Sequence, residues 1–187
     1  MGDDDADLAT RASRGDRRAL ETLLDRHADR VHALCRRVLA HPEDALDATQ
    51  EAMIAIARGI TRFDGRSAFT TWLYRVATNA ALDELRRTRR RPDPVDIGAL
   101  DRADPGPALD TSVGDRVDVD AALATIPSDF RVAVVLRDLC DLDYAQIAEV
   151  LDLPPGTVRS RIARGRALLT TALGNPEAPS GRLSTDG

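Results

Sequence analysis

The stretch from Asp143 to Leu173 constrains the fold of this chain most, because it carries the signals of a helix, a tight turn and a second helix in close succession. Asp143 suits an N-cap position, and Gln146 three residues later completes a capping box. The run from Asp152 to Gly156 interrupts this helix, and Pro155 suits the first position of the next one, where its missing N–H is not needed. The stretch therefore predicts two helices joined by a short turn.

The second of these helices has an apolar face and a polar face. The apolar face comprises Val158, Ile162, Gly165, Leu169 and Leu173, and the polar face comprises Thr157, Ser160, Arg161, Arg164 and Thr171. Hydroxyl and guanidinium groups on a narrow helix can contact base edges and phosphates in a DNA major groove. The pattern favours DNA binding, and an ordinary amphipathic hairpin with a solvated arginine face is the alternative.

Composition favours small helical bundles. The chain has 187 residues and only 3% aromatic residues, so its cores must be built from leucine, valine, isoleucine and alanine. There is no lysine, and every strong cationic contact is therefore an arginine fork suited to phosphate and guanine. The net charge of −5 does not by itself indicate nucleic-acid binding. We expect an all-α fold of two small helical domains joined by a flexible acidic linker.

No catalytic, metal or targeting pattern stands out in the chain. Cys35 and Cys140 lie far apart in sequence with no CxxC motif, which favours two buried reduced thiols, with a redox pair as the alternative. There is no phosphate loop and no metal-ligand cluster, so we predict neither an enzyme nor a cofactor. The acidic start lacks the features of a signal peptide, and no apolar run approaches a membrane span. We expect a cytoplasmic protein.

The first domain is expected over residues 16–91, after a flexible acidic N-terminus at 1–15 in which Leu8 to Arg14 can form a short helix. Asp16 caps a helix that reaches Ala40, and His27 on its apolar stripe is interpreted as a packing residue. The next helix, Glu43 to Arg58, has apolar and small residues for a core at Leu46, Ala52, Met53, Ile56 and Ala57. Its other side carries Asp44, Asp47, Gln50 and Glu51. These residues form either a solvated helix start or a docking stripe for a basic partner.

A loop and a long basic helix complete this domain. The loop Gly59 to Ala68 contains Phe63, Asp64, Gly65, Arg66 and Ser67. The helix from Phe69 to Arg91 places Trp72, Arg75, Asn79 and Arg86 on one side and ends in Arg86, Arg87, Arg89, Arg90 and Arg91. Aromatic residues beside arginines suit unstacked bases, since stacking one base on an aromatic ring contributes about 1–3 kcal/mol. A solubilising helix end is the alternative.

The residues between the two domains read as a linker over 92–117, with four prolines, three glycines and an acidic balance. A structureless segment of this length is unusual inside a compact domain, so we place a domain boundary there. The second helical domain is expected over 118–173, and a disordered tail over 174–187.

Taken together, these segments resemble the extracytoplasmic-function (ECF) class of bacterial RNA polymerase sigma factors. The matching stretches are residues 43–87 and 126–169, in this order across an acidic linker. Two sequence departures accompany the match. Asp152 stands where the family usually has a glycine in the turn, and aspartate tolerates the left-handed conformation better than most residues. Phe130 is aromatic where polar residues are common, which can mark an interface.

The resemblance implies a role for each group of residues. By this resemblance, the first domain corresponds to region two and is expected to dock on the clamp helices of the polymerase β′ subunit through Asp44, Asp47, Gln50 and Glu51. It is also expected to melt the −10 promoter element and to read the exposed strand. The residues that match this task are Phe63, Asp64, Gly65, Arg66, Ser67, Trp72, Arg75, Asn79, Arg86 and Arg87.

By the same resemblance, the second domain corresponds to region four and is expected to read the −35 element as duplex. The candidate residues are Thr157, Arg159, Ser160, Arg161 and Arg164. The resemblance also implies a contact of this domain with the β flap, passage of the linker through the polymerase cleft, and an anti-sigma factor as a further partner. An inert spacer is the alternative for the linker. A stand-alone helix-turn-helix regulator that binds DNA without core polymerase is the alternative for the whole chain.

Overall fold

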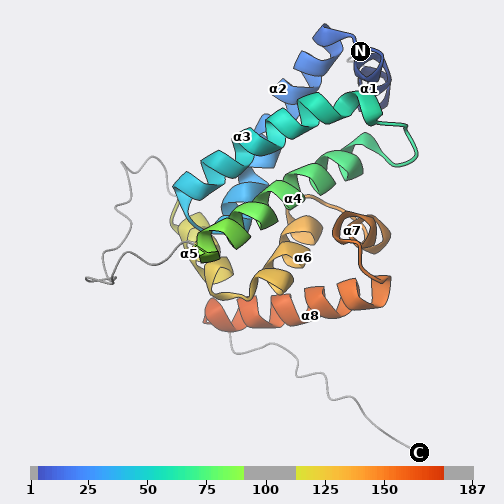
Figure 1. Cartoon of the computed structure of the whole chain (residues 1–187). Helices are drawn as coiled ribbons and strands as arrows, with labels where there is room; N and C mark the ends of the chain where they lie inside the picture. The colour runs from blue at the N-terminus through green and yellow to red at the C-terminus, as the bar shows by residue number, and fades with distance from the viewer. Residues whose placement is uncertain (1–3, 91–112, 175–187) are drawn as a thin grey trace, which may run out of the picture.

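The computed structural model describes residues 4–90 and 113–174, and every regular element in these ranges is a helix. The predicted all-α fold is thus confirmed. The elements run in chain order as α1 Asp5–Ser13, α2 Arg17–Leu39, α3 Pro42–Gly59, the 3-10 helix η1 Ile60–Arg62, α4 Phe69–Arg90, α5 Val113–Thr125, α6 Ser128–Asp138, α7 Tyr144–Leu151 and α8 Pro155–Ala172 (Figure 1).

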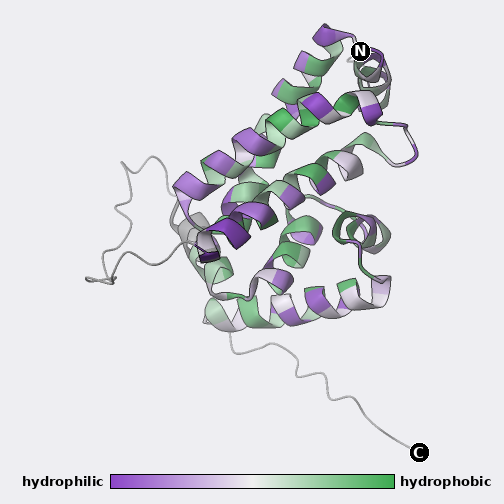
Figure 2. Ribbon diagram, viewed as in Figure 1, coloured by the Kyte–Doolittle hydropathy of each residue, from purple (hydrophilic) through white to green (hydrophobic). Residues whose placement is uncertain are grey.

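The helices form two halves that pack against each other. In the N-terminal half, α1 to α4, helix α2 contacts α1, α3 and α4; in the C-terminal half, α5 to α8, helix α8 contacts α5, α6 and α7. Figure 1 shows α7 beside α4, and the two helices are in contact. Each helix in Figure 2 carries both hydrophilic and hydrophobic residues, as expected for elements that bury one face.

Polar contacts join α4 to α7 at the seam between the halves. The Nε2 group of Gln146 donates to Oγ1 of Thr71 over 3.3 Å. Arg75 and Glu149 form a longer ion pair at 3.8 Å. Thr71 and its neighbour Tyr74 are almost completely buried. The seam therefore combines buried side chains of α4 with a partly exposed polar margin.

The predicted helix-turn-helix forms as its local signals require. Asp143 accepts from the backbone N–H of Gln146, and the Gln146 side chain accepts from the backbone N–H of Asp143, which completes the capping box. Asp152 has φ 52° and ψ 52°, so it adopts the left-handed conformation that aspartate was expected to tolerate at this turn. Pro155 lies in the first turn of α8. These expectations are confirmed.

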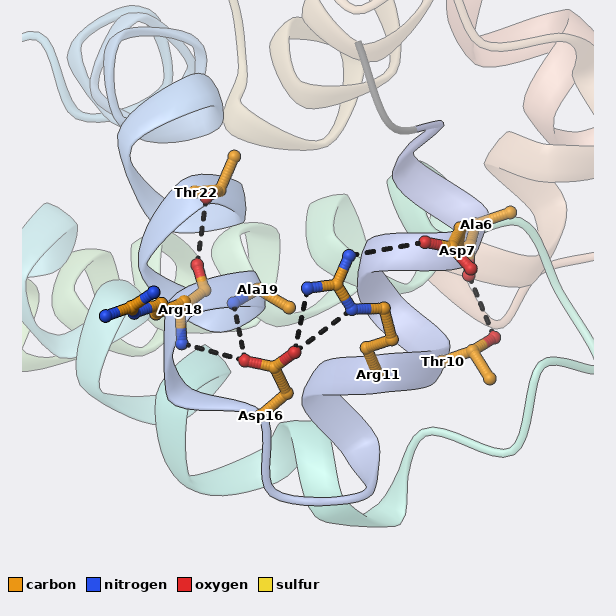
Figure 3. Close-up of polar contacts among 8 residues, drawn as sticks. All are labelled: Ala6, Asp7, Thr10, Arg11, Asp16, Arg18, Ala19 and Thr22. Carbon is orange, nitrogen blue, oxygen red and sulfur yellow. Dashed lines mark hydrogen bonds and ion pairs between the residues drawn. The ribbon is translucent and has the colours of Figure 1, made fainter.

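A flexible N-terminus over residues 1–15 was expected, with a short helix from Leu8 to Arg14, whereas the structure has a longer helix, α1, at Asp5–Ser13. Leu8, Ala9 and Ala12 are buried against the rest of the N-terminal half. Figure 3 shows how the end of α1 is fixed: Arg11 donates to Asp16 through Nε at 3.0 Å and through Nη2 at 2.9 Å. Asp16 also caps α2, so one carboxylate joins two helices.

Two further expectations differ from the structure. Leu46 was expected in the core of α3, but it is 54% exposed, because the buried side of the helix is lined by Ala45, Ala48, Ala52 and Ile56 instead. Helix α5 begins at Val113, whereas the sequence pattern extends the linker to residue 117 and starts the second domain at 118. The rest of that linker, and the tail from 175, lie outside the described residues.

Both cysteines are free thiols in environments that oppose ionisation. Burial raises the pKa of Cys35 from 9.0 to about 11, against a smaller opposing effect of a hydrogen bond with Thr49. Burial also raises the pKa of Cys140 to about 12, although a hydrogen bond with Tyr74 acts in the opposite direction. A reactive redox cysteine needs a stabilised thiolate, so both thiols suit packing better than redox chemistry.

We therefore expect alkylation of the folded chain at pH 8 to be about a hundredfold slower than alkylation of the chain in urea. The same pKa shifts should lower stability as the pH rises above about 9, because the unfolded chain then loses thiol protons that the folded chain still holds. Mass spectrometry of iodoacetamide adducts and denaturation at pH 8 and pH 10 would test both statements. Rapid labelling of either thiol at pH 8 would contradict them.

Candidate functional site

Three aromatic side chains cluster where the loop after α3 meets the start of α4. Phe63 lies 5.9 Å from Phe69 and 5.6 Å from Trp72 between ring centroids, and Phe69 lies 5.9 Å from Trp72. Phe69 is buried, whereas Phe63 and Trp72 are partly exposed. A Cβ on Gly59 would lie 3.2 Å from the Trp72 ring, so the glycine allows close packing. We call Phe63, Phe69 and Trp72 the aromatic cluster.

The predicted loop residues next to the cluster are mostly exposed. Asp64 accepts from the backbone N–H of Arg66 at 3.1 Å and pairs with its Nε at 3.0 Å, which closes a tight turn. Gly65 has φ +73°, a conformation that glycine adopts without strain. Ser67 is partly buried. The loop thus presents polar groups beside aromatic faces, which is an arrangement suited to an unstacked base.

The predicted polar residues of α4 extend away from this cluster along about 20 Å of helix. Arg75 is turned toward α7, where it pairs with Glu149. Asn79 is exposed. Arg86 pairs with Asp83 on the same helix, and the Arg87 side chain is 56% exposed. The structure therefore keeps these residues on one helix but does not gather them into one compact site.

A pocket of about 350 Å³ lies between α3 and α4 and joins two sets of predicted residues. Glu51 from the predicted docking stripe lines it together with Asn79 and Arg87 from the predicted −10 set. Glu84 also lines it, is only 1% exposed and pairs with Arg87 at 2.9 Å. Sequence reasoning missed Glu84, because an acid in a charged helix end reads as solvent-exposed.

The acidic side of α3 is largely open. Asp47, Gln50 and Glu51 are exposed, and Ile54 one turn further along the same face is 44% exposed. Asp44 differs, because its Oδ2 accepts from the Thr88 hydroxyl at 3.1 Å and is thus tied to the end of α4. Together with exposed Leu46, the face offers apolar as well as acidic contacts. We call Leu46, Asp47, Gln50, Glu51 and Ile54 the α3 face.

The second predicted DNA-binding set lies on α8. Thr157, Ser160, Arg161 and Arg164 line one hollow of about 520 Å³ with the start of α6. Arg161 is paired with Asp129 of α6 at 3.0 Å, while Arg164 is exposed.

The aromatic residue that sequence analysis marked as unusual, Phe130, also lines this hollow. Helix α8 approaches α6 closely here because Gly165 has no side chain. A Cβ at this position would lie 2.5 Å from Cγ2 of Val134.

Arg159 is separate from this hollow. Its guanidinium carbon lies over the Tyr144 ring at 5.6 Å from the centroid, and Arg137 lies over the same ring at 5.4 Å. Cation–π contacts of this kind hold an arginine in place without neutralising its charge. Tyr144 is a residue that sequence reasoning missed, and nothing in the helical spacing of α7 distinguishes it from a packing residue.

Comparisons with known proteins agree with these two halves. The family model described as Sigma-70 region 2 matches residues 23–91, and the model described as Sigma-70, region 4 matches residues 116–169. The ECF RNA polymerase sigma-E factor of Haemophilus influenzae is 37% identical over 177 residues, which cover 88% of this chain and 93% of that protein. This chain belongs to the ECF sigma factors of RNA polymerase.

Other relatives support the assignment of this chain to the ECF sigma factors. The sigma-E factor of Escherichia coli K12 is 38% identical over 85% of this chain and 88% of its own length. SigM of Mycobacterium tuberculosis is 37% identical over 91% of this chain and 85% of its own length. The solved structure of CnrH in complex with the cytosolic domain of CnrY has a TM-score of 0.71 and 25% identity, and covers 93% of this chain and 99% of that chain.

A further solved structure shares the fold of this sigma factor. RpoE from Bartonella quintana, solved in complex with the anti-sigma factor NepR, has a TM-score of 0.67 and 22% identity over 82% of this chain and 96% of that chain. The family defines the function at a general level: the chain binds core RNA polymerase and directs promoter-specific transcription initiation. A stand-alone DNA-binding regulator is not favoured.

Within the described residues, no helix is both long enough and apolar enough to cross a bilayer.

Proposed function

We propose that the N-terminal half docks on the β′ clamp helices and captures the melted −10 strand, while the C-terminal half reads the −35 duplex. The observation that carries this proposal is that Glu51 and Asn79 line one pocket. A docking surface and a DNA-reading face that adjoin in this way let the polymerase place the −10 strand directly. A stand-alone regulator has no need of that juxtaposition.

The aromatic cluster and its loop are suited to hold a base out of the helix. Phe63 and Trp72 are partly exposed and rest on buried Phe69, so their orientation is fixed before DNA binds. Unstacking a base costs a few kcal/mol, and stacking on an aromatic ring returns about 1–3 kcal/mol of this. Asn79 can read a base edge because its amide both donates and accepts. Arg87 and its neighbours would hold phosphates.

On α8, the exposed hydroxyl and guanidinium groups provide the −35 contacts. Arg164 makes no ion pair within the described residues and is the strongest candidate for a base or phosphate contact. Arg161 must exchange its pairing with Asp129 for DNA, which lowers its net contribution. A well-placed arginine–guanine contact contributes about 1–3 kcal/mol of discrimination.

Two protein partners complete the proposal. On the polymerase, the α3 face binds the clamp helices through acidic contacts and through the apolar side chains of Ile54 and Leu46, and the C-terminal half rests on the β flap. An anti-sigma factor would hold the chain inactive, which is supported by the shared fold with RpoE in its complex with NepR. The chain acts in the cytoplasm, as an initiation factor without catalysis of its own.

Transcription in vitro tests the proposal, with Arg164→Ala as the informative variant. Core polymerase plus the chain should start at a cognate promoter, and Arg164→Ala should lower the yield from a promoter that needs its −35 element by about tenfold. Arg166→Ala is the matched control on the same helix, because Arg166 is tied to Asp138 of α6 at 3.1 Å. If the chain binds duplex tightly alone but never directs core polymerase, the proposed function is wrong.

A further inference from the structure

Helix α1 is held on the rest of the N-terminal half by a carboxylate that reaches a buried histidine. Oδ2 of Asp5 lies 2.8 Å from Nε2 of His27, and Asp5 also pairs with Arg26. His27 is 1% exposed, and its other ring nitrogen, Nδ1, is buried with no hydrogen-bond partner. Asp5 thus supplies the hydrogen bond that orients the His27 ring.

Asp5 remains a carboxylate at neutral pH in this position. Burial acts to raise the pKa of Asp5, but hydrogen bonds from Arg26 and His27, together with the positive charge of Arg26, lower it below its ordinary value. An ionised acceptor makes a stronger hydrogen bond than a neutral one. The hydrogen bond between Asp5 and His27 is therefore a strong one, although Asp5 lies near the start of the chain.

The His27 ring connects this anchor to the aromatic cluster. Its centroid lies 5.5 Å from that of Phe69, with the ring planes at 62°. Phe69 in turn contacts both Phe63 and Trp72. An unbroken series of contacts thus leads from Asp5 through a buried histidine to the two rings that are exposed for a base.

Helix α1 also supports η1, which leads into the loop with Phe63 to Ser67. Helix α1 packs against η1 and against α4. Leu8 and Ala9 of α1 and Ile60 of η1 are all buried. The far end of α1 is fixed by Arg11 and Asp16 (Figure 3). The helix is thus secured at both ends while its middle packs against η1 and α4.

We propose that Asp5 and His27 are positioning residues for promoter opening, which makes α1 a working part of the −10 machinery. The proposal rests on the proposed function, in which the aromatic cluster takes the melted base. Without the Asp5–His27 contact, the His27 ring can rotate and α1 can lift, so Phe69 no longer holds Phe63 and Trp72 in one orientation. The stacking surface then has to be ordered when the base arrives, which reduces opening.

The test compares Asp5→Asn with Asp7→Asn. Both substitutions remove one negative charge from α1, but Asp7 is 60% exposed and makes only a loose pair with Arg11 at 3.6 Å. Trp72 is the single tryptophan of the chain, so intrinsic fluorescence of the free protein reports directly on the aromatic cluster. Permanganate footprinting of unpaired thymines in the holoenzyme–promoter complex reports on opening.

We expect Asp5→Asn to red-shift the Trp72 emission and to lower the opened fraction by about tenfold, as for loss of one charge-assisted hydrogen bond. Retention of the holoenzyme on −35 duplex should not change. Asp7→Asn should stay within about twofold of the unchanged protein in every measurement. The proposal is overturned if Asp5→Asn behaves like Asp7→Asn in either the fluorescence or the opening assay.

A second variant covers the case in which Asp5→Asn unfolds the half. His27→Phe keeps a ring against Phe69 but removes the bond to Asp5. It should reproduce the opening defect, and the double variant should be no worse than either single one, since both remove the same contact. Additive defects would overturn the proposal. If the unchanged chain opens no promoter, the proposed function is overturned instead. The Trp72 spectrum of the free chain does not depend on that function, so the two failures can be told apart.

Discussion

Replacing Asp47 and Glu51 with arginine is expected to weaken binding of the chain to core RNA polymerase by about a hundredfold, with no change in helical content. Both side chains are exposed on the α3 face and lie one turn apart. Two reversed charges would repel a basic clamp helix and leave its cations without partners. Because neither residue packs in the core, the fold should tolerate the change.

The matched control is Asp25→Arg with Asp29→Arg. These two residues lie on α2, are also exposed and are also one helical turn apart. The control therefore changes the net charge by the same amount and at the same spacing along a helix. Fluorescence anisotropy of labelled chain titrated with core polymerase gives both affinities, and circular dichroism gives the helical content. Equal affinities for the two double variants would remove the docking assignment from the α3 face.

Introducing leucine at Gly165 is expected to destabilise the C-terminal half by about 3 kcal/mol. Even a Cβ there would lie 2.5 Å from Cγ2 of Val134 and 3.0 Å from the backbone oxygen of Phe130. Val134 can turn only within a close-packed core, and the backbone oxygen cannot turn at all. Helix α8 must therefore move away from α6, which also opens the hollow that Arg161 and Arg164 line.

Gly156→Leu is the control, because it is the same substitution in the same helix with open space around it. Leucine is a better helix former than glycine, so this variant should be equally or more stable than the unchanged chain, by up to about 1 kcal/mol. Urea denaturation followed by circular dichroism distinguishes the two. Similar midpoints for both variants would mean that α8 does not depend on close contact with α6.

Local signals in the sequence were sufficient for the elements whose stability is local. The capping box of Asp143 and Gln146, the turn at Asp152 and the start of α8 at Pro155 each depend on residues within one helical turn. The same is true of most of the apolar stripe of α8: Val158, Ile162 and Gly165 are buried as expected, whereas Leu173, expected on the same face, follows the helix and is 44% exposed. Such features can be predicted from residue spacing because the interactions that cause them join residues close together in the sequence.

Features that depend on distant residues could not be predicted. The acidic start of the chain suggested a flexible N-terminus with at most a short helix. Burial of Leu8, Ala9 and Ala12, together with contacts of Asp5 to Arg26 and His27 more than twenty residues away, makes it a packed helix. Leu46 looked like a core residue because α3 has apolar residues on two sides. The structure buries the side with small alanines, since α3 packs closely on α2 and α4.

The candidate site shows the same division. Phe63 and Trp72 could be selected as aromatic residues near arginines, but the buried Phe69 that joins them has no distinguishing pattern in the sequence. The proximity of Glu51 to Asn79 depends on how α3 crosses α4, which periodicity does not specify. The roles assigned to the α3 face, to α4 and to α8 remain predictions until the variants are measured.

The contact between α4 and α7 has a consequence for the energetics of promoter binding. Elements centred at −35 and −10 are separated by roughly 25 base pairs, or about 85 Å of duplex. In this structure, by contrast, α4 of one half is in contact with α7 of the other. A chain that reads both elements must first separate its halves, so the free energy of the seam is subtracted from its affinity for polymerase and promoter. A ligand that binds the arrangement with the two halves in contact more tightly than the separated arrangement would therefore oppose transcription. It would not need to cover any DNA-reading residue.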